Sequence, residues 1–164
     1  MSADLRWVEL NGTSATPTLG LANINVGSID AANMDASAYP VRLGSNAFDK
    51  WLKIEFLPGG FSRVSNFKVW RSDNEGGDGV AFPTGVSMQG EAGGTSNLTY
   101  TPPSDQPINA SEFPYTEASA LNVGPTEIDG NGGETYLIHF QLQTSGLATT
   151  GDYGFALTFR YDEE

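Results

Sequence analysis

His139, the single histidine of the sequence, has the side chain best suited to acid–base chemistry. Histidine is the only side chain that titrates near neutral pH without perturbation. In the segment 136–143 it alternates with Ile138, Phe140 and Leu142, so a strand would direct it away from the core. No G-x-S-x-G pentapeptide accompanies it, and histidine metal sites take several imidazoles or thiolates. We expect a histidine on the surface or on the second face of a sheet, and no catalytic base.

Two acidic, glycine-rich segments, 73–79 and 127–134, offer oxygen atoms that calcium could use. The candidate ligands are Asp73, Glu75 and Asp78 in the first segment, and Asp129, Asn131 and Glu134 in the second. Neither segment follows the EF-hand pattern, and Asp-Gly and Asn-Gly pairs form ordinary turns. The same carboxylates could act as an acid and base pair on a glycoside, but no separation between them follows from the sequence. We expect plain turns and no metal.

Other catalytic chemistries lack their residues. The chain has no cysteine, which excludes thiol catalysis and thiolate metal sites. There is no P-loop, and a dinucleotide fingerprint built on Gly130 and Gly132 would need a further glycine where Thr135 stands. We therefore expect a protein that is not an enzyme and that has no catalytic residue and no cofactor.

The charge balance limits the partners. Twenty acidic residues against eight basic ones give a formal net charge of −12, which opposes binding to nucleic acid and to anionic membranes. No stretch approaches the roughly 18 apolar residues of a membrane span. The segment 1–7 has neither a basic nor an apolar signal region, so we expect synthesis in the cytoplasm.

The segments that carry these residues are predicted to be strands. The clearest is 153–161, where aromatic and aliphatic residues fall on every second position, with Leu157 at the centre and Thr158 beside it on the opposite face. Glycines and prolines concentrate between such segments, and no helix-period run exceeds about two turns. The candidate strands are 5–10, 19–26, 39–43, 51–57, 66–72, 85–89, 97–101, 136–143 and 153–161. This pattern predicts an all-β fold, an antiparallel β-sandwich of jelly-roll type with about eight strands.

Length and composition predict one domain over 1–164, because 38% of the residues are hydrophobic and no internal repeat divides the chain. Residues 1–45 read as an N-terminal arm. Residues 102–133 lack sustained alternation and read as a long loop excursion that contributes little to the core and much to a contact.

The three tryptophans, Trp7, Trp51 and Trp70, leave two interpretations open. Exposed aromatic rings would suit sugar stacking or a protein interface, whereas buried aromatic rings are the commoner case.

Several strands resemble those of a group of tailed-bacteriophage virion proteins. The resemblance runs over about residues 50–164, with a strand S-N-F-K-V-W at 65–70 and a closing strand T-F-R-Y-D-E at 158–163. It strengthens at 83–87 and at 97–102. The resemblance implies a virion component, either a capsid decoration protein or a minor head protein, with no catalytic residues to carry over.

From the resemblance and the charge we expect a structural protein on the exterior of a phage capsid, with the major capsid protein as its partner. Weak contacts to several capsid subunits at once would add up to strong attachment. A homotrimer at capsid threefold positions is compatible with this role. The alternative is a β-sandwich binding module that holds carbohydrate or a host-surface receptor through exposed aromatic rings or a calcium-ordered loop.

Overall fold

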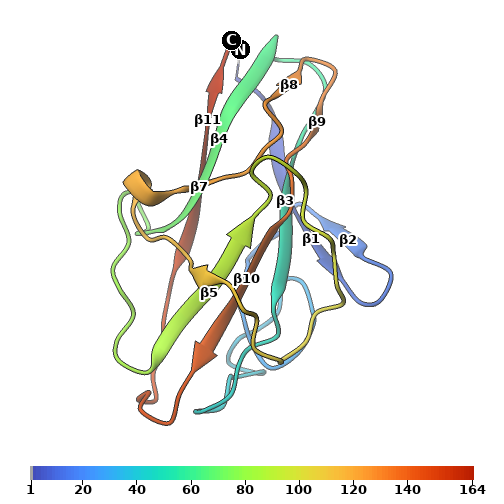
Figure 1. The fold of residues 1–164 in the computed structure, drawn as a ribbon. Helices are drawn as coiled ribbons and strands as arrows, with labels where there is room; N and C mark the ends of the chain where they lie inside the picture. The colour runs from blue at the N-terminus through green and yellow to red at the C-terminus, as the bar shows by residue number, and fades with distance from the viewer. Residues whose placement is uncertain (1) are drawn as a thin grey trace.

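The computed structural model describes residues 2–164, which form eleven strands in two antiparallel sheets and one short 3-10 helix, η1 (Glu117–Ser119). The predicted all-β class and the antiparallel pairing are confirmed. The two sheets lie face to face, as in a β-sandwich (Figure 1). The jelly-roll connectivity stays a prediction.

The larger sheet has seven strands and the smaller sheet has four. The larger sheet runs in the order β2 (Thr16–Leu19), β1 (Leu5–Asn11), β3 (Lys50–Phe56), β10 (Ile138–Thr144), β5 (Val86–Ala92) and β6 (Ser111–Glu112), with β9 (Gly133–Glu134) also paired to β3. The smaller sheet runs in the order β11 (Ala156–Glu163), β4 (Arg63–Ser72) and β7 (Leu121–Asn122), with β8 (Glu127–Asp129) also paired to β4.

The main core lies between the sheets, where the apolar faces of β3, β4 and β10 meet. Phe67 and Val69 face inward as their alternation predicted, and both are fully buried. Asn66 has a positive φ of 55°, and the pairing of β4 with β11 shifts register at the same level, so a bulge lets both Val64 and Phe67 face the core. Burying each such side chain contributes about 1.5–3 kcal/mol.

The outer face of the larger sheet is also covered. A second apolar cluster of Val8, Leu10, Trp51 and Leu137 lies there, with Leu98 and Tyr100 of the segment 93–110 packed against it. Strand β10 therefore has both faces buried.

The expectation that residues 102–133 contribute little to the core is wrong. Three of their side chains, Phe113, Val123 and Ile128, belong to the main core cluster. Their strands β6, β7 and β8 are only two or three residues long. Because such strands are too short to show a period, the sequence pattern missed them.

Residues 1–45 are not a separate arm throughout, since β1 and β2 form a hairpin within the larger sheet. The segment from 20 to 45 contains no strand, so the strands predicted at 39–43 and over most of 19–26 are wrong, and so is the strand at 97–101. Hydrogen bonds from the backbone to side chains hold these segments where strand pairing was predicted. Oδ1 of Asn33 accepts a hydrogen bond from the Ala22 amide, and Oδ1 of Asn97 accepts one from the Leu137 amide.

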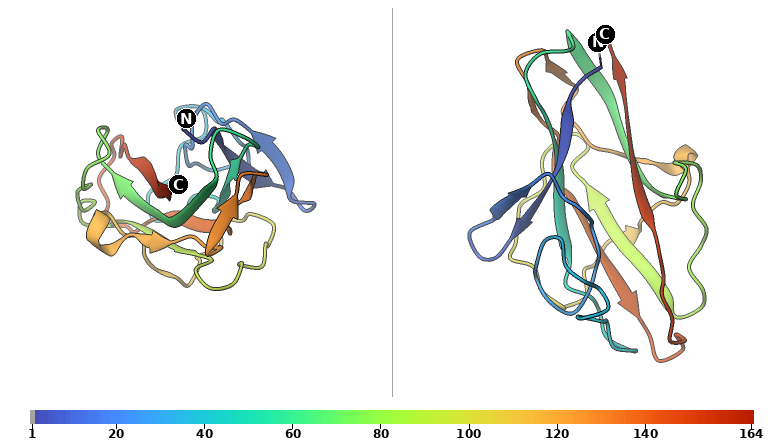
Figure 2. Two further views of the ribbon diagram at one scale, coloured as in Figure 1. Left: turned by 90° about the horizontal axis from the view of Figure 1, so that it is seen from above. Right: turned by 180° about the vertical axis from the view of Figure 1, so that it is seen from behind.

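Strand β11 has the phase that its alternation predicted, with Phe155, Leu157, Phe159 and Tyr161 packed against the main core. It forms one edge of the smaller sheet. Both ends of the chain lie at the same end of the sandwich (Figure 2), where the Ala3 amide donates a hydrogen bond to Oε2 of Glu163.

Candidate functional site

His139 lies on the second face of the larger sheet, which is one of the two positions expected from the sequence. Its side chain is buried there. Its Nε2 lies 2.8 Å from Oδ2 of Asp49, and its ring stacks on Trp51 with the centroids 3.8 Å apart. Its Nδ1 has no hydrogen-bond partner among residues 2–164, and the nearest carboxylate oxygen, on Glu91, is 3.5 Å away. The hydrogen bond and the stacking hold the imidazole ring between Asp49 and Trp51 on this face of the sheet.

Asp49 is the centre of a buried polar network that fastens the segment 93–110 to the sheet. Its Oδ1 accepts a hydrogen bond from the Ser104 amide at 2.6 Å, and its Oδ2 accepts one from Nε1 of Trp51 at 3.0 Å. Nearby, Oε1 of the buried Gln141 accepts a hydrogen bond from the Ile108 amide at 3.0 Å. These polar side chains replace the backbone pairing that the loop lacks.

A second buried polar pair fastens the segment 28–35. Nζ of Lys50 lies 2.6 Å from Oε1 of Glu9, and both side chains are at most 1% exposed. The same Nζ donates a hydrogen bond to the Ala31 carbonyl at 2.7 Å. Asp30 completes the attachment, because its Oδ2 accepts a hydrogen bond from the Gly12 amide.

Both acidic segments form hydrogen-bonded turns. Oδ1 of Asp73 accepts hydrogen bonds from the amides of Glu75 and Gly77, and Oδ1 of Asp129 accepts one from the amide of Asn131. Within residues 2–164, no group of three or more His, Asp or Glu side chains comes together in a way that could hold a metal ion.

The tryptophans differ in exposure. Trp51 and Trp70 are 3% and 2% exposed, so neither offers a ring to solvent. Trp7 is half-buried and meets Phe159 edge to face, with the ring centroids 6.2 Å apart.

Most of the basic side chains are paired with a carboxylate or buried. Five of the eight form ion pairs, which are Arg6 with Glu55, Lys50 with Glu9, Lys53 with Glu134, Arg63 with Glu127 and Glu164, and Arg160 with Glu117. A sixth, Arg71, is 3% exposed, with its guanidinium 3.9 Å above the ring of Phe82, and burial lowers its pKa. Within the described chain only Arg42 and Lys68 are neither paired with a carboxylate nor buried, too few to neutralise a row of phosphates.

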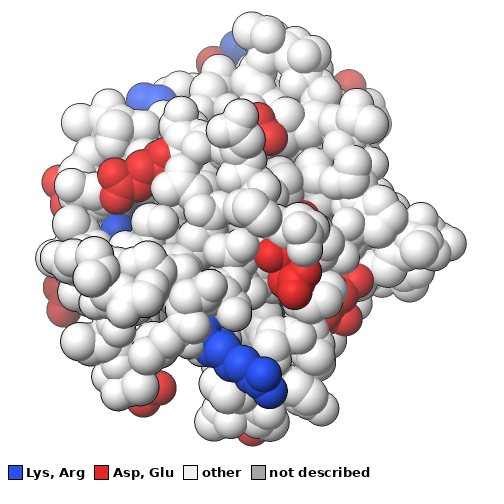
Figure 3. Space-filling model, turned by 60° about the horizontal axis from the view of Figure 1, so that its bottom comes forward, with Lys and Arg blue, Asp and Glu red and all other residues white. Residues whose placement is uncertain are grey.

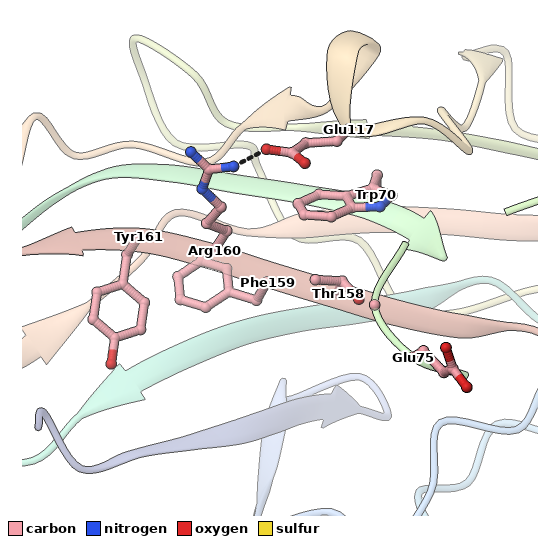
Figure 4. Close-up of a pocket in the computed structure, with 8 residues that line it drawn as sticks. Trp70, Glu75, Glu117, Thr158, Phe159, Arg160 and Tyr161 are labelled. Atoms are coloured by element: carbon pink, nitrogen blue, oxygen red, sulfur yellow. Dashed lines mark ion pairs between the residues drawn. The ribbon is translucent and has the colours of Figure 1, made fainter. Parts of the chain in front are cut away.

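A shallow groove of about 430 Å³ runs beside β11, and we call it the edge groove. It is lined by Trp70, Glu75, Gly76, Glu117, Thr158, Phe159, Arg160 and Tyr161. Arg160 pairs with Glu117 of η1 on one side of β11, whereas Phe159 and Tyr161 point to the other side (Figure 4). The groove therefore lies over the outer face of the smaller sheet, where β11 and β4 run side by side.

A second surface lies at the end of the sandwich opposite the chain termini. The segments 36–47, 79–87 and 143–151 meet there, and we call them the loop end. The Thr144 amide donates to the Ser45 carbonyl, and the Ser145 amide donates to the Gly85 carbonyl. Beneath them Ala47, Val86, Leu142 and Ala148 form a small apolar cluster that holds the three segments together.

The loop end is nearly free of charge. Its three segments contain one charged residue, Arg42, although 17% of the chain is charged. Four of the five large apolar side chains that are exposed within residues 2–164 belong to it, and the fifth, Leu19, lies on β2. The four are Tyr39 at 43%, Leu43 at 47%, Val80 at 78% and Leu147 at 75%. Figure 3, which turns this end toward the viewer, shows a mostly uncharged surface with scattered acidic groups and a few basic ones.

Sequence reasoning missed both surfaces. The exposed leucines and valine of the loop end stand in short Gly, Ser and Thr-rich turns, where the absence of charge was the only signal. The edge groove depends on which strand ends the sheet, and strand order is not visible in the alternation.

No helix within residues 2–164 is both long and apolar enough to cross a lipid bilayer. The chain matches no protein-family model, no curated protein and no solved structure.

Proposed function

We propose that this protein is a non-enzymatic virion structural protein that decorates and reinforces the exterior of a tailed-phage capsid, and that it holds the major capsid protein through the loop end. The observation that carries the proposal is the gathering of exposed apolar side chains on a nearly uncharged end of an acidic molecule. Exposed apolar side chains on a surface with little charge are typical of protein interaction sites.

The charge supports an outer position on the particle. Since five of the eight basic side chains are paired with carboxylates, the surface offers few cations to packaged DNA. The resemblance of 65–70 and 158–163 to virion strands agrees with this position.

The alternative is a module that binds carbohydrate or a host receptor. A sugar platform needs exposed aromatic rings, and two of the three tryptophans are buried. We therefore prefer contact with protein.

The test is co-sedimentation of the purified protein with capsids that lack it. We expect the intact protein to sediment with capsids and to show no affinity for duplex DNA at physiological salt. Leu147→Glu and Val80→Glu should each weaken capsid binding at least about tenfold, about 1.4 kcal/mol, because both side chains are more than 70% exposed and stand at the proposed contact.

Leu19→Glu is the matched control, since Leu19 is 50% exposed but lies on β2, outside the loop end. It should bind like the wild type. If the intact protein stays in the supernatant, the decoration role is wrong. If it sediments but the two loop-end variants bind as well as the control, the loop end is not the contact.

A further inference from the structure

Strand β11 is a long edge strand with one unpaired side. Pairing at that side does not depend on the proposed function. Eight residues of β11 pair with β4 on one side and with no strand of residues 2–164 on the other. The other outermost strands are short, with four residues in β2, which contains Pro17, and two in β6. Proteins commonly blunt sheet edges with short strands, proline, charged side chains and bulges. Strand β11 is long and has no proline, and its charges and the bulge opposite it are confined to the second half of the strand, so residues 156–159 are a flat, uncharged edge.

The core is incomplete beneath this edge. The inward side chains of β4, such as Phe67 and Val69, are 0% exposed, whereas Leu157 and Phe159 on the neighbouring β11 are only half-buried. Trp7 on β1, across the gap between the sheets, is half-buried too. A strand added beside β11 would place every second side chain over this gap, since successive side chains point to opposite faces of a sheet.

The outer face of the smaller sheet is hollowed next to this edge. There the edge groove of about 430 Å³ borders Thr158 and Arg160 of β11 and Trp70 of β4, with Glu75 and Gly76 at one end and Glu117 at its flank. The outward side chains of an added strand would lie beside Thr158 and Arg160 and reach this groove from the edge.

The charge around the edge is acidic. Glu75, Asp162 and Glu163 are exposed and have no basic partner among residues 2–164, whereas Arg160 is paired with Glu117. Lys68 and Arg71 lie opposite Arg160 and Leu157 in register, Arg71 is buried, and Arg63 is paired with Glu164, so Lys68 is the one further cation near the edge that is neither buried nor paired. This balance favours a basic segment and opposes a second copy of a chain whose net charge is −12.

We propose that the free edge of β11 binds an extended, basic segment of a partner protein as an added strand. Apolar side chains of that segment lie over Trp7 and Phe159, and lysine or arginine side chains lie in the edge groove. The backbone ladder with β11 supplies affinity, and the alternation of apolar and basic side chains supplies selectivity.

The probe is a synthetic eight-residue peptide of alternating lysine and valine with blocked ends. Its binding is followed by acrylamide quenching of tryptophan fluorescence, because Trp51 and Trp70 are already buried and Trp7 is the ring that an added strand would cover. We expect saturable protection of Trp7. A matched peptide of alternating glutamate and valine should bind at least tenfold more weakly, because glutamate would meet the acidic rim.

Two N-methylated forms of the lysine–valine peptide test the backbone ladder. In a strand, the amides of alternate residues point to opposite sides. Only one of the two sets of amides, those of the valines or those of the lysines, can face β11. The peptide methylated on that set should therefore not bind, and the peptide methylated on the other set should bind like the unmethylated one. Equal binding by the two forms would overturn strand addition, as would the absence of any protection of Trp7.

Leu157→Gln and Leu43→Gln are the protein variants. The first places an amide over the gap and should weaken peptide binding at least tenfold, whereas the second makes the same change at the exposed Leu43 of the loop end, away from β11, and should change it less than threefold. If Leu157→Gln does not fold, the methylated peptides still decide. A dimer of the unliganded protein that disappears in Leu157→Gln would assign the edge to a second copy and overturn the proposal.

Discussion

Single polar side chains hold the irregular half of this molecule in place. Asp49 and Gln141 fasten the segment 93–110, and Lys50 fastens the segment that contains Ala31. Each replaces hydrogen bonds that a strand ladder would otherwise supply. Loss of one such side chain leaves its buried partners unsatisfied, so a substitution there costs more than the contact itself.

The buried pair of Lys50 and Glu9 gives the first prediction. Lys50→Met should lower the free energy of unfolding by about 3–5 kcal/mol, because it leaves the Glu9 carboxylate buried without a cation. The double variant Glu9→Gln/Lys50→Met should recover a large part of this loss. Urea denaturation of the three proteins measures it, and equal stability of the single and double variants would contradict the argument.

Tyr100 predicts how stability changes at alkaline pH. Burial, with smaller contributions from Asp30 and Asp49, raises its pKa from 10.0 to about 12, and its hydroxyl donates to the Gly12 carbonyl. The folded state therefore keeps a proton that the unfolded state loses, so this contribution is full below pH 10 and is lost as the pH rises from 10 to about 12.

The matched variant is Tyr100→Phe, which keeps the ring against Trp51. Between pH 10 and about 12 its free energy of unfolding should fall less steeply than that of the wild type. Parallel curves for the two proteins in this range would show that Tyr100 does not titrate as described.

At the scale of elements, sequence predicted the strands that have one polar face. Strand β3 shows Lys53 and Glu55 between its buried residues, and β11 shows Thr158 and Arg160. In β10 the polar His139 lies on a face that is buried beneath the segment 93–110. The alternation of residues within a strand does not show whether a loop packs over its polar face.

The edge strand gives an element-scale prediction. Leu157→Asp should destabilise the protein more than Thr158→Asp, because Leu157 packs against the main core and Thr158 lies on the opposite face. Since Leu157 is only half-buried, we expect a loss of about 2–3 kcal/mol rather than complete unfolding. Thermal melts followed by circular dichroism measure the difference, and equal melting temperatures would mean that the assigned phase is wrong.

The segment 102–133 gives another prediction at this scale. Replacing residues 104–130 with a short Gly/Ser linker should abolish folding, because it removes β6, β7 and β8 together with Phe113, Val123 and Ile128. Loss of the near-ultraviolet circular dichroism signal would report this. A cooperative thermal melt of the deletion variant would contradict the place given to this segment in the core.

The whole molecule is acidic, and backbone amides already donate hydrogen bonds to the carboxylates of Asp73 and Asp129 in its two acidic turns. We therefore expect the melting temperature to be the same in excess chelator and in millimolar calcium. A ligand that binds only the folded state at about 100 times its dissociation constant would add about 2.7 kcal/mol. A rise of several degrees with calcium would favour the binding-module alternative.

The position of Ala3 beside Glu163, at the end opposite the loop end, has a practical consequence. A short linker between the two termini should allow circular permutation, with new ends opened at the exposed turn 145–147. Such a permutant would carry any fused cargo on the loop end, the face proposed to contact the capsid. Comparing cargo attached at the native ends with cargo attached at the new ends would show directly which way the molecule stands on that partner.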